Sequence, residues 1–198
     1  MKHKILYGSY SFAAIVVFML FVQAHTFALT VVLKQPVPLQ QETMANLKHE
    51  NQNDNDRWKL VVFGFTHCKD VCPMSLANFS MLVKAAAAEQ IQLDGTFVSV
   101  DPDRDTDTVL SGYTNSFGPN IAFLRLEDKE LERFMAAFGA EALFYTKNEG
   151  NQFNYQVDHS STAFLIDPEG RIRVLFDALE DARDIEKMLR ENQAFFKS

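Results

Sequence analysis

Two spacings of apolar residues run along this chain, and together they predict strands and helices in alternation. Residues 60–65, 96–100 and 121–126 are short apolar runs with few polar breaks, which is typical of central strands covered on both faces. After each run, apolar residues recur every three or four positions, as on one buried face of a helix. The expected buried positions are Leu76, Phe79, Val83 and Ala86, then Val109, Tyr113 and Phe117, then Leu131, Phe134, Met135 and Phe138. Gly139 is expected to end the third helix.

The last part of the chain predicts a hairpin and a closing helix. A turn sequence at 167–170 joins apolar runs at 162–166 and 172–176, and residues 180–195 return to helical spacing. Three strand–helix units followed by two strands and a helix predict an α/β fold, with a mixed, mostly parallel sheet and helices on both faces. Sheets of this kind place their sites beyond the carboxyl ends of the strands. The two cysteines of the chain follow the first predicted strand and therefore fall at such a position.

The N-terminal residues differ in character from the rest of the chain. Lys2 and Lys4 precede an uncharged, largely apolar stretch at 5–22, which is the pattern of a secretion signal or of a membrane anchor. The continuity of this stretch favours a retained anchor, and the two lysines are expected to stay in the cytoplasm. The leader lacks the arginines of a mitochondrial transit peptide. We therefore expect a bacterial envelope protein, anchored in the inner membrane with a periplasmic domain, or released to the periplasm if the leader is cleaved.

Domain organisation and charge narrow the range of partners. Residues 1–28 are the signal peptide or transmembrane anchor, residues 29–57 are expected to be a linker and lead-in, and residues 58–198 to form one folded domain. The leader holds two of the 19 basic residues and none of the 26 acidic ones, so the remainder has a formal charge of −9. A chain without a basic stripe is a poor candidate for binding nucleic acid. Its negative charge suits cations or a basic partner.

Cys68 and Cys72 are the only cysteines, and they lie about one helical turn apart where a helix is expected to begin. A helix N-terminus stabilises a thiolate, and Lys69 adds a neighbouring positive charge, so both thiols are expected to be reactive. Such a pair can hold one soft metal ion, or it can form and reopen a disulfide. The spacing alone leaves both chemistries open.

Three histidines lie beyond the leader region and could supply a third ligand. His49 falls in the polar lead-in and is expected at the surface. His67 adjoins Cys68, and neighbouring side chains of an extended segment point to opposite faces, which disfavours it as a ligand. His159 directly precedes the run at 162–166. Taken alone, its position does not distinguish a ligand from a structural histidine.

Three separated segments, GFTHCKDVCP, SVDPDRDTDTVLSGYTNSFG and VDHSSTAFLIDPEGRI, resemble the Sco/SenC family over about residues 58–196. The resemblance implies a thioredoxin-like fold and a membrane-anchored copper-binding protein that assists assembly of the copper centre of cytochrome c oxidase. It implies copper ligation by Cys68, Cys72 and His159. The acidic and basic residues that match family positions are read mainly as shaping loops or capping helices. They are Asp70, Asp101, Asp103, Arg104, Asp105 and Asp158.

The function that this resemblance implies is that of a copper metallochaperone. Its partner would be the copper-centre subunit of cytochrome c oxidase or another copper-receiving protein. Cys68 and Cys72 are also expected to form a redox-active disulfide, because a pair that accepts Cu(I) must first be reduced. The alternative is a thiol–disulfide oxidoreductase that keeps the cysteines of a copper-site partner reduced. Such reductases usually carry two residues between their cysteines, whereas this chain has three.

Overall fold

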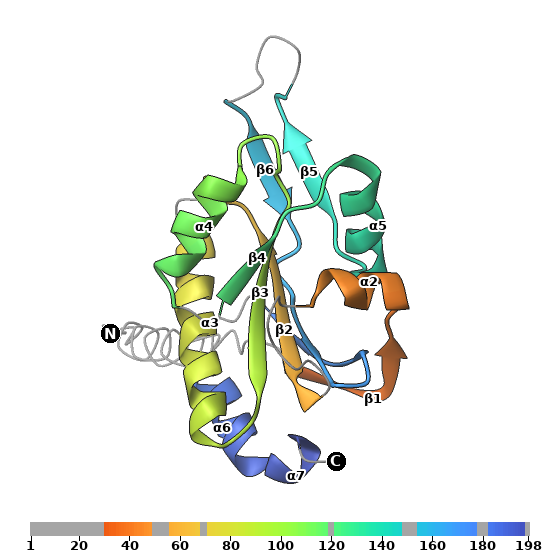
Figure 1. Cartoon of the computed structure of the whole chain (residues 1–198), viewed down its shortest axis with the longest axis vertical. Helices are drawn as coiled ribbons and strands as arrows, with labels where there is room; N and C mark the ends of the chain where they lie inside the picture. The colour runs from red at the N-terminus through yellow and green to blue at the C-terminus, as the bar shows by residue number, and fades with distance from the viewer. Residues whose placement is uncertain are drawn as a thin grey trace, which may run out of the picture.

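A six-stranded mixed sheet forms the centre of the protein, with helices packed on both sides of it (Figure 1). The computed structural model describes residues 30–48, 56–67, 71–118, 121–147, 154–177 and 182–196, with side chains for all of these except 71–74 and 182–185. The strands are β1 (Thr30–Pro38), β2 (Trp58–Gly64), β3 (Leu93–Ser99), β4 (Ile121–Leu124), β5 (Ala142–Tyr145), β6 (Gln156–His159), β7 (Ala163–Ile166) and β8 (Arg171–Phe176). The helices are α2 (Gln41–Asn46), α3 (Val71–Ala88), α4 (Asp107–Asn115), α5 (Asp128–Phe138), α6 (Ala182–Glu191) and α7 (Gln193–Phe196).

The sheet has a parallel half and an antiparallel half, in the order β1-β8-β7-β2-β3-β4. Strands β2, β3 and β4 run parallel, and β7, β8 and β1 continue the sheet through antiparallel pairs. The turn at 167–170 closes the β7–β8 hairpin, with Gly170 at a φ of 77° that favours glycine. The mixed sheet predicted from the sequence is therefore confirmed. Strands β5 and β6 form a separate antiparallel pair, which stands at the top of Figure 1.

Alternation along β2 separates the two layers of the core. Leu60 and Val62 face one side, where they join the buried residues of α3, α4 and α6. Val61 and Phe63 face the opposite side and pack with α5 and the end of α2. A strand that is buried on both faces reads as a continuous apolar run, which explains why β2 is recognisable in the sequence. Figure 1 shows α3, α4 and α6 on the left of the sheet and α5 with α2 on the right.

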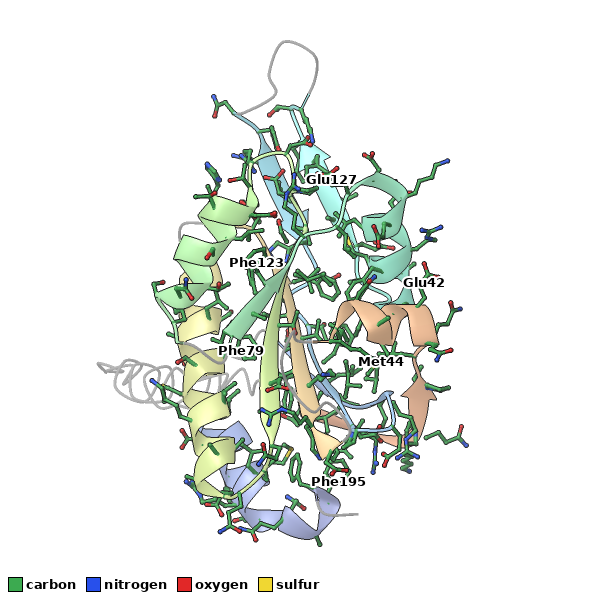
Figure 2. The ribbon with its side chains drawn as sticks, in the orientation of Figure 1. Glu42, Met44, Phe79, Phe123, Glu127 and Phe195 are labelled. Atoms are coloured by element: carbon green, nitrogen blue, oxygen red, sulfur yellow. The ribbon has the colours of Figure 1, made fainter. Side chains whose placement is uncertain are left out.

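The predicted inner faces of α3 and α5 are buried. Leu76, Phe79, Val83 and Ala86 of α3 are each at most 3% exposed. Figure 2 shows Phe79 between α3 and β3. Gly95 of β3 makes this approach possible, because a Cβ there would lie 2.4 Å from the Cζ atom of Phe79. Gly139 ends α5 in the left-handed conformation, as predicted.

Three features differ from the sequence-based expectation. Residues 29–57 were expected to be a linker and lead-in, whereas the structure places β1 and α2 within them. The β5–β6 pair was not predicted. Val109 was expected to be buried, but it is 41% exposed, and Leu110 faces the core in its place. Of these differences, the β5–β6 pair matters most for the site, because it adds strands at the carboxyl edge of the sheet that the apolar spacing did not predict.

The expected leader, residues 1–28, lies outside the described residues. None of the helices in the described part of the chain combines the length and apolar character needed to cross a bilayer.

Candidate metal site

Of the three expected ligands, the structure describes the side chain of His159 alone. Cys68 lies outside the described residues, and of Cys72 only the backbone is described, in the first turn of α3. His159 is the last residue of β6 and is partly buried. The arrangement places the histidine beside the segment that leads into the first cysteine.

His159 packs on Phe65, the residue that directly follows β2. The two rings meet edge to face, with centroids 5.7 Å apart and an interplanar angle of 88°. The Nδ1 atom of His159 lies 2.9 Å from the carbonyl oxygen of Ser160. A carbonyl oxygen only accepts, so Nδ1 carries the proton in this contact, and the lone pair of the neutral ring lies on Nε2. A histidine fixed in this way is a typical metal ligand through Nε2.

A buried carboxylate holds the segment that precedes Cys68. Asp105 is fully buried and accepts hydrogen bonds from the Thr66 backbone N–H (3.1 Å), the Thr66 hydroxyl (2.5 Å) and the Ser99 hydroxyl (2.7 Å). Because the carboxyl ends of β2 and β3 lie at the same edge of the sheet, one side chain after β3 reaches the turn after β2. Asp105 therefore fixes the backbone two residues before the first cysteine.

A second buried carboxylate, that of Asp101, holds the residue that precedes the strand of His159. Asp101 accepts hydrogen bonds from the hydroxyl of Tyr155 and from Nε of Arg104. Nη1 of Arg104 donates to the carbonyl oxygen of Tyr155 at 3.0 Å. Burial and the hydrogen bond to Asp101 raise the pKa of Tyr155 well above its ordinary value of 10.0. Tyr155 directly precedes β6, so this cluster fixes the start of the strand that ends in His159.

Arg104 connects the two halves of the site. Its guanidinium lies 3.8 Å from the ring centroid of Tyr155 and 5.6 Å from that of Phe65, so one cation packs on both aromatic rings. The loop of residues 99–105, which we call the clamp loop, thus contacts both the turn before Cys68 and the residue before β6. Sequence analysis identified its acidic and basic residues as loop-shaping, which agrees with these contacts. It missed Tyr155, Thr66 and Phe65, whose partners lie up to 94 residues away.

Of the other histidines, His67 alone lies within the described residues. The side chain of His67 is 53% exposed, with Nδ1 3.3 Å from the Thr66 hydroxyl and 3.9 Å from Asp105. His49 lies outside the described residues. Within the described ranges, no three His, Cys, Asp or Glu side chains gather as a metal site. A site that uses the cysteine sulfurs would necessarily include atoms beyond those ranges.

Solved structures share this architecture. The apo Sco1 protein of Thermus thermophilus is 26% identical and superposes with a TM-score of 0.62 over 86% of this chain and 99% of that one. Bradyrhizobium japonicum ScoI, solved with copper bound, is 25% identical, with a TM-score of 0.60 over 79% of this chain and 97% of its own. The fold is the thioredoxin-like α/β fold that the sequence resemblance implied.

The sequence matches a family model and curated relatives as well. The model for SCO1/SenC matches residues 43–193, so this chain belongs to the SCO1/SenC family. An SCO2-like protein of Rickettsia prowazekii is 32% identical over 133 residues, which is 66% of this chain and 63% of that protein. The mitochondrial SCO1 homolog of Homo sapiens is 33% identical over 126 residues, 61% of this chain and 41% of that protein. This chain thus spans less than two thirds of the length of these relatives.

Proposed function

We propose that this protein is a copper metallochaperone that binds one copper ion through the sulfurs of Cys68 and Cys72 and the Nε2 atom of His159. The observation that carries the proposal is the packing of His159 on Phe65, three residues before Cys68. Thiolates select Cu(I), and imidazole accepts copper in either oxidation state. Membership of the SCO1/SenC family and the copper-bound ScoI of Bradyrhizobium japonicum support copper as the cargo.

The ion is delivered during assembly of the copper centre of cytochrome c oxidase, with the subunit that carries this centre, or another copper-receiving protein, as the partner. Support comes from the three family motifs of the sequence. The two thiols lose two electrons when they form a disulfide, which offers no thiolate to copper, so loading requires the reduced pair. We place the domain in the bacterial periplasm, attached to the inner membrane by residues 1–28. Bacterial relatives such as that of Rickettsia prowazekii support a bacterial envelope.

Copper titration of the reduced protein against a competing Cu(I) chelator tests the ligand set. The parent should bind one copper ion. Cys68→Ser, Cys72→Ser and His159→Ala should each weaken binding by more than the roughly 10–100-fold that is typical of changes in outer-shell residues. His67→Ala is the matched control and should bind like the parent, because that ring is half exposed and faces Thr66 and Asp105.

The same variants separate the metal site from thiol exchange. An oxidoreductase needs both cysteines but not the histidine, since the reacting group is a thiolate. If His159→Ala bound copper like the parent, and X-ray absorption showed only sulfur ligands, the three-residue site would be wrong. If the fully oxidised protein bound copper as tightly as the reduced one, the cysteines would not be ligands at all.

A further inference from the structure

A groove with a volume of about 930 Å³ lies between α5, β5 and the loop that follows β3. Its apolar lining includes Leu131 and Met135 of α5 and Leu143 and Phe144 of β5. Three consecutive apolar residues of β5 are open to solvent, since Leu143 is 54% exposed, Phe144 39% and Tyr145 48%. A cluster of exposed apolar side chains beside a groove is typical of an interaction surface.

The groove carries uncompensated negative charge. Asp128, Glu132 and Glu141 line it and are exposed, and within the described part of the chain no ion pair involves any of the three. Its one cation, Lys147, pairs with Asp103 at 2.5 Å. An acidic rim around an apolar lining is complementary to apolar side chains accompanied by lysine or arginine. The formal charge of −9 on residues 25–198 also favours a partner that carries positive charge.

The groove adjoins the candidate metal site through the backbone of the β5–β6 pair. Ala142 pairs with His159 in the ladder, and Glu141 exchanges hydrogen bonds with Ser160. Among the described residues β6 is the only strand paired with β5, so the other edge of β5 is available to a further strand. An extended segment in the groove would therefore lie beside the strand that faces His159.

We propose that this groove binds an extended segment of a partner protein, in which apolar side chains stand next to lysine or arginine, and that it brings this partner beside His159. The purpose of this docking, exchange of copper with the partner, rests on the proposed function, but the surface itself does not. A second copy of this chain fits less well, because a two-fold contact at this groove would bring the same three carboxylates together.

Site-specific photo-crosslinking in the cell of origin tests the occupant. The full chain carries p-benzoylphenylalanine in place of Leu143 or, as the control, in place of Val109. Val109 is also exposed, at 41%, but lies on α4 across the sheet from α5. We expect a crosslinked partner from position 143 only, attached through a segment with apolar and basic residues. An adduct of lipid, of a second copy, of residues 1–29 or of an acidic segment would overturn the proposal, as would no adduct above the control.

Charge reversal tests the complementarity with the captured partner, purified. Glu132→Lys should weaken its binding by at least about fivefold at low salt, since an attractive pair becomes repulsive, and the difference should shrink as salt rises. Glu191→Lys makes the same charge change on α6 and should leave binding unchanged. Equal effects of the two variants would refute the acidic rim. Both variants should bind copper like the parent. If the parent itself bound no copper, the proposed function would be refuted, whereas the docking result would stand.

Discussion

Removal of one hydroxyl from Tyr155 tests how strongly the clamp loop holds the site. Tyr155 is 5% exposed, and its hydroxyl donates to the fully buried carboxylate of Asp101. A hydrogen bond to a charged group contributes about 1.5–3 kcal/mol. Tyr155→Phe keeps the ring under the Arg104 guanidinium, so the loss is confined to that bond. We expect the free energy of unfolding to fall by about 2 kcal/mol and the melting temperature by roughly 4–8 °C, given the usual scaling for a domain of this size.

Urea denaturation followed by circular dichroism measures the free energy, and copper titration measures the effect on the site. Tyr155 lies four residues before His159, so we expect weaker copper binding with an unchanged stoichiometry of one. Tyr145→Phe is the matched control, because its side chain is 48% exposed and its hydroxyl contributes within about 0.5 kcal/mol. If the two variants had the same stability and the same copper affinity, the clamp loop would not position β6.

Two further predictions concern buried acids at the same edge of the sheet. The raised pKa of Tyr155, caused first by burial and then by Asp101, gives stability that is fully present below about pH 10 and is lost as pH rises from there towards the folded pKa. The difference in free energy of unfolding between the parent and Tyr155→Phe should therefore shrink above pH 10, and a constant difference would contradict the assignment. Asp105→Asn leaves one acceptor oxygen for three donors and should cost about 1–3 kcal/mol and weaken copper binding, as measured by denaturation and titration. Asp107→Asn, an exposed change in the first turn of α4, should cost only about 0.3–1 kcal/mol, and equal losses would refute the role of Asp105.

The elements that sequence patterning predicted are those buried on a face or on both. Strand β2 reads as an apolar run because helices cover both of its sides. Helix α5 shows an apolar stripe because one of its faces packs in the core. Strand β1 was missed because it is an edge strand with seven of its nine residues exposed and two prolines, so its sequence reads as a linker. Strand β5 was missed because its apolar residues do not enter the core.

The candidate site divides in a similar way. The cysteine pair is visible locally, since its spacing and its place after a strand point to a reactive site. His159 required the family resemblance, because a single histidine carries no pattern of its own. The partnership of Tyr155 with Asp101 has no local signal, since the hydrogen bond joins residues 54 positions apart and depends on the fold being complete. The hint available in the sequence was the acidic residues of this loop, because a carboxylate that becomes buried requires hydrogen-bond donors.

The separation of β5 and β6 from the main sheet has a consequence for the rate at which the proposed copper site would release its ion. Five of the eight residues in these two strands are exposed, and neither strand contains a fully buried side chain. Segments with so few buried contacts open at a lower free energy than the core that carries them. If His159 binds copper as proposed, it could withdraw from the ion while β2 and α3 stay folded. Residence time on the protein would then be governed by the local opening of two short strands, a quantity that amide hydrogen exchange reads directly.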